Sequence, residues 1–454
     1  MNIILATSNG TGMGHLTRQA AVALQLTEEH DATLFSMSLG LPVVLRLGLR
    51  GEYCPSHERR FFEPREWESY LKERIVLLAR ELNASVFVFD GVAPYLGIGR
   101  ARAEMPDVRF VWLRRGMWRQ GTGRMLQRSS YFDLIIEPGD LAGDADRGPT
   151  TGMSDAVRVN PISLLESADM LPRQEARDEL GLPHDKLVAL LTLGTGRHGE
   201  FAGPGGAAAA ELLEHPDLHL AVTKWATANK DVPMPDGVTE LRGVFPLVRY
   251  LNAFDLAVSS AGYNAVHEMV PAGIPTLFVA NTATRTDDQV ARAMRLAEKG
   301  LALANRDDDL EGVAHATRML LDASLREHLA EAASSTRDTI TGAADTAELI
   351  TSDSHYNQPE RETIQVMIGL QRDGRFRQIV KLLLGERGTA FVKRLLGRPV
   401  PKPTNVRSTR LLITSSVTVE DLRRDRPVEH ILPDTSPEYQ AARRLMIRRY
   451  YTVI

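Results

Sequence analysis

Short apolar runs alternate with longer amphipathic stretches along the first third of the chain. Five of the runs predict β-strands, and two stretches with apolar residues on one face predict helices between them. The strands are Ile3–Thr7, Ala32–Ser36, Ser85–Phe89, Val108–Leu113 and Leu134–Glu137, and the helices are Leu16–Leu26 and Glu66–Leu82. Strands that alternate with helices in this way predict a parallel sheet in an α/β fold.

A second series of the same kind begins after a break in the pattern. The break is the Gly/Asp-rich segment Gly139–Thr151, which is followed by Asn160 and Pro161 and predicts an interdomain connection. The predicted strands are Leu187–Leu193, Leu218–Thr223, Thr239–Gly243, Leu256–Val258 and Pro275–Val279, and helical patterns cover Gly206–Leu213 and Asp309–Thr339. We therefore expect an N-terminal domain over residues 1–158 and a C-terminal domain over residues 159–350.

Residues 351–454 break the alternation and predict a separate extension. They carry 19 Lys and Arg against 11 Asp and Glu, whereas the rest of the chain carries 35 against 47. The extension contains a basic amphipathic stretch, residues 371–396, and a predicted strand at Leu411–Val419. Its charge favours contact with an anionic membrane surface or a protein partner, although packing back onto the domains is an equal alternative.

Composition excludes several classes of protein. The 454 residues suffice for two or three domains, and the formal net charge of −4 gives no reason to expect a nucleic-acid partner. Cys54 is the single cysteine, so neither an intramolecular disulfide nor a cysteine-based metal cluster is expected. No run reaches the ~18 apolar residues of a membrane span, and the first strand does not read as a signal peptide. We expect a cytoplasmic protein, with the inner face of the membrane as a second location.

The segment from Phe254 to Gln289 contains the most informative motif. An apolar strand ends in the small-residue turn Ser260-Ala261-Gly262, a helix then carries Glu268, and a second apolar strand follows. In a doubly wound sheet this turn lies at the carboxyl end of a strand, where the free N–H groups of the following helix suit a phosphate. A carboxylate one turn into the helix suits the two hydroxyls of a ribose.

This segment resembles the nucleotide-sugar binding motif of GT-B glycosyltransferases, in particular glycosyltransferase family 28. Members of this group include the N-acetylglucosaminyltransferase that makes a lipid-linked cell-wall precursor. The resemblance covers about residues 1–350 and implies two Rossmann-like domains facing a cleft, with the donor on the C-terminal domain and the acceptor on the N-terminal one. It implies inverting transfer of a hexose or N-acetylhexosamine from UDP, with dTDP the alternative, to a hydroxyl of a glycan, lipid or small molecule.

The resemblance also assigns roles to individual positions. It implies a donor sugar contact at Asp288 and Gln289, and a nucleoside contact at Phe245 and Glu268. Asp287, next to this pair, is expected to cap a helix. The donor diphosphate is assigned to Gly12, Gly14, Gly194, Thr195, Gly196, Ser260, Gly262, Tyr263 and Asn264, with Arg197 a further candidate.

The loop after the first strand supplies the candidate general base. Its glycines, Gly10, Gly12 and Gly14, do not have the G-x-G-x-x-G spacing of a dinucleotide-binding loop, and His15 ends it. A histidine has a suitable pKa for taking the acceptor proton, and Asp90, at the end of another strand, is a candidate to orient it. The structural alternatives are a histidine at a helix start and an aspartate that forms a turn or cap.

Three features leave the function open. Ser163 stands where the cell-wall enzyme often has Arg, which puts an identical substrate in doubt. The Arg114–Arg119 cluster (RRGMWR) is either an exposed structural loop or a docking site for an anionic or membrane-borne acceptor. The motifs contain no carboxylate cluster for Mg²⁺, so a metal-independent transferase without a cofactor is expected. A nucleotide-sugar epimerase of the same architecture and a non-catalytic donor-binding subunit remain alternatives.

Overall fold

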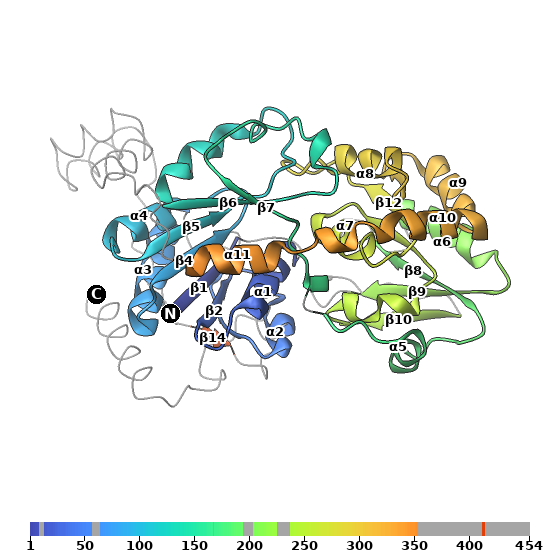
Figure 1. Ribbon diagram of the computed structural model, residues 1–454, viewed down its shortest axis with the longest axis horizontal. Helices are drawn as coiled ribbons and strands as arrows, with labels where there is room; N and C mark the ends of the chain where they lie inside the picture. The colour runs from blue at the N-terminus through green and yellow to red at the C-terminus, as the bar shows by residue number, and fades with distance from the viewer. Residues whose placement is uncertain are drawn as a thin grey trace, which may run out of the picture.

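The computed structural model describes residues 1–8, 13–56, 64–166, 168–193, 203–224, 237–352 and 411–413. They form two α/β halves, each built on a largely parallel sheet, which lie side by side in Figure 1. The expected alternation of strands and helices is therefore present. The extension lies outside the described residues, apart from its start at the end of the last helix and one three-residue strand.

The N-terminal sheet has eight strands among the described residues, of which seven run parallel. In spatial order they are β14 (Leu411–Ile413), β3 (Arg50–Tyr53), β2 (Asp31–Ser36), β1 (Asn2–Thr7), β4 (Val86–Asp90), β5 (Arg109–Leu113), β6 (Leu134–Pro138) and β7 (Val157–Val159). Its helices are α1 (Gly14–Gln25), α2 (Leu41–Val44), α3 (Pro64–Leu82) and α4 (Leu96–Glu104), with 3-10 turns η1 (Leu45–Leu47), η2 (Gly123–Tyr131) and η3 (Gly143–Ala145). β14 pairs antiparallel with the edge strand β3.

The C-terminal sheet is parallel throughout its six described strands. Their order is β10 (Val238–Arg242), β9 (Leu218–Lys224), β8 (Leu187–Thr192), β11 (Leu256–Ser260), β12 (Thr276–Ala280) and β13 (Leu303–Arg306). The helices are α5 (Arg173–Leu180), α6 (Pro204–Leu213), α7 (Tyr263–Met269), α8 (Gln289–Glu298), α9 (Leu310–Leu320), α10 (Ala323–Ser334) and α11 (Gly342–Thr351), with η4 (Leu164–Glu166), η5 (Leu247–Ala253) and η6 (Arg337–Thr339).

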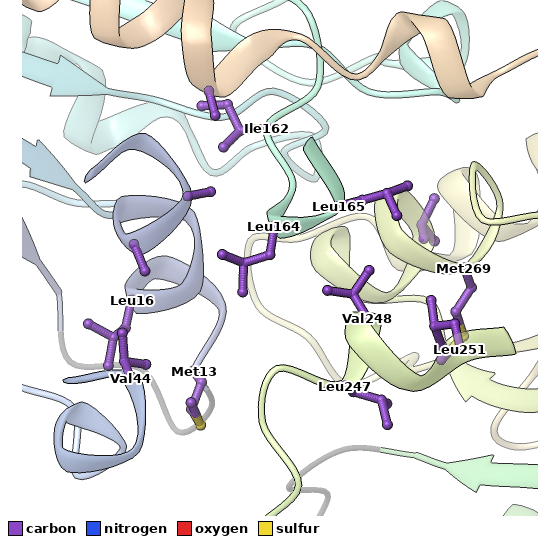
Figure 2. Close-up of a cluster of buried hydrophobic side chains, with 14 of the residues drawn as sticks. Met13, Leu16, Val44, Ile162, Leu164, Leu165, Leu247, Val248, Leu251 and Met269 are labelled. Atoms are coloured by element: carbon purple, nitrogen blue, oxygen red, sulfur yellow. The ribbon is translucent and has the colours of Figure 1, made fainter. Parts of the chain in front are cut away.

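Both sheets are covered on both faces, which explains why their strands read as continuous apolar runs. Ile3 and Leu5 of β1 point into one buried cluster, whereas Ile4 and Ala6 point into another on the opposite face. The first of these clusters continues into the C-terminal half (Figure 2). There Leu164 and Leu165 of η4 lie between Leu16 of α1 and residues of η5 and α7.

The strand order reverses at one point in each sheet. Chain order runs outward in one direction from β1 through β3 and in the other from β4, so the reversal lies between β1 and β4; in the second sheet it lies between β8 and β11. Ligands of doubly wound sheets bind outside the carboxyl ends of the strands at this reversal. The loops that follow these four strands are therefore where a site is expected.

The chain leaves the first sheet later than the Gly/Asp-rich segment suggested. Residues 139–151 precede β7, which still pairs with β6. Helix α11, the last one in the described part of the chain, returns to the first half and lies beside α1 (Figure 1). Arg109, at the start of β5, donates to the carbonyls of Leu349, Ile350 and Ser352 at the end of this helix.

Candidate functional site

His15 and Asp90 meet because two neighbouring strands end at the same edge. Asp90 is the last residue of β4 and is paired with Thr7 of β1, while His15 lies in the first turn of α1, which begins after β1. The His15 Nδ1 atom lies 2.7 Å from Asp90 Oδ1. The ionised carboxylate accepts a hydrogen bond from Nδ1–H, so the lone pair of the ring lies on Nε2. Nε2 has no hydrogen-bond partner among the residues that the structure describes.

Arg18 is a third member of this group that the sequence did not single out. It lies one helical turn after His15 and donates from Nε to Asp90 Oδ2 at 2.9 Å and from Nη2 to Asp90 Oδ1 at 2.6 Å. Asp90 is fully buried, and 2% of the Arg18 side chain is exposed. The spacing of three residues on a helix was the available signal, since such residues lie on one face.

The surroundings of this group favour an ionised Asp90 and a neutral His15. Burial opposes the charge of Asp90, but Arg18 and then His15 outweigh it and hold the pKa of Asp90 below its ordinary value. Burial lowers the pKa of His15, and the attraction of Asp90 offsets only part of this effect. Arg18 and Arg115 lower it further. A neutral imidazole with a free Nε2 is suited to accept a proton.

The start of α7 contacts the start of α1. The Asn264 side chain donates from Nδ2 to the backbone carbonyl of Gly14 at 3.2 Å. Its Oδ1 atom is buried and has no partner in the described part of the chain. Gly262 precedes the helix and supplies no side-chain cap, while Ser260, the last residue of β11, is half-buried. The predicted diphosphate residues of this turn therefore lie beside the histidine helix.

The Tyr263 side chain joins the two halves. Its hydroxyl donates to the Gly139 carbonyl at 2.9 Å and accepts from the Ile162 N–H at 3.0 Å. Its ring lies under the Arg18 guanidinium, 4.9 Å from the ring centroid. The side chain thus connects α7 to α1 and to the interdomain connection, which leaves only its backbone for a ligand.

Glu268 is a half-buried carboxylate with no hydrogen-bond partner among the described residues. It lies one turn after Asn264 on α7. Burial raises the pKa of Glu268 to about 8, because none of the residues that the structure describes compensates its charge. Such a group is ready to accept hydrogen bonds from a ligand. The neighbouring His267 instead accepts the Leu141 N–H at Nε2, 3.0 Å away, and is fully buried.

The helix cap after β12 was assigned to the wrong aspartate. Asp288, not Asp287, is the N-cap of α8, and its Oδ1 accepts from the Ala291 N–H at 3.1 Å. Asp287 instead lies 3.1 Å from Arg115 and 3.0 Å from Arg292. Burial opposes its charge, but these two cations hold the pKa of Asp287 at about 2. The cap falls one residue later because the N–H groups of α8 face Asp288.

The side chains of Gln289 and Phe245 contact other parts of the protein. Gln289 accepts from the Asn281 N–H at 3.2 Å and donates to Asp287 Oδ2 at 3.2 Å. Phe245 is half-buried and packs against the core cluster that joins the two halves. The sugar and nucleoside contacts assigned to these residues stay predictions.

The Arg114–Arg119 cluster is not an exposed loop, and its contact with an acceptor stays a prediction. Trp118 is 1% exposed and forms an antiparallel bridge with Asp287, while Arg119 donates from its backbone to the Thr286 carbonyl at 2.8 Å. Arg114 is buried and paired with Asp155 at 2.7 Å. The cluster joins the halves because Arg115, Trp118 and Arg119 contact Thr286 and Asp287 in the loop before α8.

Several predicted residues lie outside the described residues, namely Gly10, Gly12, Gly194, Thr195, Gly196, Arg197 and the basic stretch of the extension. Ser163 is buried, and its Oγ accepts from the Leu165 N–H at 3.1 Å.

Within the described ranges, no group of three or more His, Cys, Asp or Glu side chains is placed to hold a metal ion. In the same ranges no helix is long and apolar enough to span a membrane.

Comparisons with known sequences find a similarity to one family in part of the C-terminal half. Residues 240–350 match the glycosyltransferase family 28 C-terminal domain. Over 236 residues the chain is 30% identical to a UDP-N-acetylglucosamine--N-acetylmuramyl-(pentapeptide) pyrophosphoryl-undecaprenol N-acetylglucosamine transferase of Clavibacter sepedonicus, a match that covers 48% of this chain and 60% of the relative. A protein of the same name from Limosilactobacillus fermentum is 30% identical over 101 residues, which is 22% of this chain and 27% of the relative. The chain thus spans less than two thirds of either relative.

Solved structures show the fold. Spinosyn rhamnosyltransferase SpnG complexed with thymidine diphosphate aligns with a TM-score of 0.52 and 17% identity over 78% of this chain and all of that one. MurG of Acinetobacter baumannii aligns with a TM-score of 0.50 and 16% identity over 77% of this chain and 99% of that one. The predicted GT-B fold and the resemblance to glycosyltransferase family 28 are confirmed.

Proposed function

We propose that this chain, similar to glycosyltransferase family 28 in its C-terminal half, is an inverting glycosyltransferase. It moves a hexose or N-acetylhexosamine from a nucleoside diphosphate to an acceptor hydroxyl. UDP is the proposed nucleotide, because the names of both curated relatives specify a UDP-sugar. The observation that carries the proposal is the His15–Asp90 pair beside the start of α7, with Nδ1 and Oδ1 2.7 Å apart.

The proposed reaction is a single displacement at the anomeric carbon. The acceptor oxygen forms a bond to this carbon on one face, and the bond to the diphosphate oxygen breaks on the other with its electron pair. His15 Nε2 takes the acceptor proton, and Asp90 stabilises the resulting imidazolium and holds the ring. One displacement inverts the configuration of the sugar.

The donor is proposed to lie on the C-terminal half. The Glu268 carboxylate accepts hydrogen bonds from both ribose hydroxyls. The ribose thus supplies the hydrogen bonds that the described residues do not give this carboxylate. Backbone N–H groups at residues 262–264 and 194–197 are proposed to hold the diphosphate and its developing charge. No metal is required in this proposal. Activity that EDTA abolishes and Mg²⁺ restores would overturn that part.

The acceptor is proposed to be a glycan, a lipid or a small molecule. The relatives named above act on a pyrophosphoryl-undecaprenol, so a lipid-linked acceptor is tested first. Residues 351–454, with their excess of Lys and Arg, are proposed to contact an anionic membrane surface or a protein partner. The protein then works in the cytoplasm at the inner face of the membrane.

The test combines UDP-sugars with lipid-linked, glycan and small-molecule acceptors. UDP release and the anomeric configuration of the product by NMR are the readouts. We expect a glycoside of inverted configuration that His15→Gln abolishes, while His184→Gln, an exposed histidine paired with Asp178, retains the activity. A retained configuration would contradict the displacement. Epimerised donor without any acceptor would establish an epimerase. Full biological activity in His15→Gln, lost in Glu268→Ala, would establish a donor-binding subunit.

A further inference from the structure

Arg18 places a positive charge inside the candidate site, where the proposed reaction gives it no role. Both of its bonds to Asp90 are charge-assisted, and together they hold the carboxylate in one plane. Nη2 also lies 2.9 Å from His15 Nδ1. Because Oδ1 is shared between the imidazole and the guanidinium, the position of Asp90 fixes the position of the His15 ring.

The guanidinium is held from the other side by the C-terminal half. The Tyr263 ring lies 4.9 Å from Arg18 Cζ, and Tyr263 is the first residue of the helix that carries Glu268. A cation over an aromatic face is stabilised most when both are desolvated, and 4% of Tyr263 is exposed. The same side chain therefore contacts the proposed base, its carboxylate partner and the proposed donor helix.

We infer that Arg18 is a positioning residue that couples the His15–Asp90 pair to the docking of α7 against α1. The effect of this coupling on catalysis rests on the proposed function, because His15 acts as a base only in the proposed transfer reaction. The coupling itself is a property of the side chains. Arg18 contacts neither the reacting atoms nor the donor in this scheme; it acts through Asp90.

The coupling makes a prediction about His15 that simple packing does not make. The charged groups that face His15 are Asp90 from β4, Arg18 from its own helix and Arg115 from the loop after β5. Removing the Arg18 charge leaves Asp90 and one cation, so the pKa of His15 rises. A space-filling role for Arg18 would leave this pKa in place.

The experiment is an NMR titration of the His15 ring in the full chain with labelled histidine, assigned with His15→Gln. Four variants are compared: Arg18→Met, Arg18→Lys, Tyr263→Leu and Tyr263→Phe. We expect Arg18→Met to raise the His15 pKa by about one unit, and Arg18→Lys, which keeps the charge, to stay nearer the wild type. Tyr263→Leu removes the ring and shifts His15 in the direction of Arg18→Met, whereas Tyr263→Phe keeps the ring and leaves the titration unchanged.

Kinetics supply a second readout. Arg18→Met is expected to lower kcat/KM for the acceptor by about 10- to 100-fold and to move its acid limb to higher pH, because His15 must be neutral to act. The KM for the donor should stay within about threefold, since no donor contact is removed. Arg18→Lys should recover part of the loss.

Two results would overturn the inference. One is a His15 titration and an acid limb that Arg18→Met leaves unchanged. The other is equal titrations in Tyr263→Leu and Tyr263→Phe. If Arg18→Met does not fold, Arg18→Lys and the two Tyr263 variants still decide the question. If the wild type transfers no sugar from any nucleotide, the proposed function fails, while the titration still tests the coupling.

Discussion

The side-chain amide of Asn264 donates to the backbone carbonyl of Gly14, 3.2 Å away. This bond joins the start of a helix in one half to the start of a helix in the other. Each helix follows a strand at the point where the order of its sheet reverses. His15, the proposed base, lies on the first of these helices, and the Glu268 carboxylate lies on the other. The contact between the helix starts therefore brings the two elements that carry them together.

Glu268→Gln is expected to stabilise the ligand-free protein at pH 8. The carboxylate has a folded pKa of about 8 against an ordinary 4.5, so the folded state binds more protons between these values and loses stability as pH rises through them. A neutral amide of the same shape removes this cost, which we expect to raise the free energy of unfolding by about 1–3 kcal/mol. Urea unfolding of the variant and the wild type at pH 5 and pH 8 measures this difference in the free energy of unfolding. Equal stability of variant and wild type at pH 8 would contradict the account.

Nucleotide binding is expected to release protons near pH 7. A ribose that donates to Glu268 favours its ionised form, so a carboxylate that is protonated in the free protein ionises in the complex. Calorimetric titrations with UDP in buffers of different ionisation enthalpy count the protons. The release should vanish in Glu268→Gln, and a release of the same size in this variant would assign it to another group.

Stability is expected to fall between pH 6.5 and pH 4 because of His267. Burial lowers the pKa of this histidine to about 4, so the unfolded chain binds one more proton than the folded chain in this window. As pH is lowered through this window, protonation of the unfolded chain at His267 decreases the free energy of unfolding by up to ~3 kcal/mol. The neutral ring is needed because Nε2 accepts the Leu141 N–H. In His267→Gln the slope of stability against pH should be shallower; an unchanged slope would remove His267 from the account.

Arg292→Met is expected to destabilise the protein by about 3–5 kcal/mol, because it removes the arginine partner of the buried Asp140 carboxylate and one of the two arginine partners of Asp287. Arg292 is fully buried and lies 2.7 Å from Asp140 and 3.0 Å from Asp287. The matched control is Arg295→Met, one turn further along α8, where solvent screens a partly exposed pair with Asp144 and the loss of stability should be much smaller. Thermal and urea unfolding of both variants give the comparison, and similar losses would be inconsistent with a buried network.

The strands and the His15–Asp90 pair were predictable because they depend on local order and on one rule of sheet geometry. Apolar runs identify parallel strands that are covered on both faces, and parallel strands bring their carboxyl ends together. Asp90 could thus be paired with His15 across 75 residues. Glu268 was recognised from its motif, and its lack of a hydrogen-bond partner within the described part of the chain was visible only in three dimensions.

Other elements were missed for identifiable reasons. Helix α4 contains Gly97 and Gly99, which lower helix propensity. A Cβ at Gly97 would lie 2.6 Å from the Glu68 carbonyl, and one at Gly99 would lie 2.9 Å from the Tyr131 ring. These glycines permit close packing that no local pattern reports.

Contacts between the halves were the largest omission. The partners of Arg115 and Trp118 come from the loop before α8, more than 160 residues later in the chain. A run of arginines with an aromatic residue therefore suggested a surface, although Arg114 and Trp118 are buried and Arg115 and Arg119 are half-buried. The role of Arg18 was hidden for the same reason, because the ring of Tyr263 comes from the other half.

The most direct test of the central claim is a calorimetric titration of the full chain, together with a thermal-shift measurement. Both use UDP, dTDP, GDP and a panel of UDP-sugars, and both are repeated with Glu268→Ala. The account predicts selective binding of UDP and of one UDP-sugar, a rise in the unfolding temperature by mass action, and the loss of both effects in the variant. A well-folded wild type that responds to no nucleotide, or a Glu268→Ala variant that binds UDP with unchanged affinity, would contradict it.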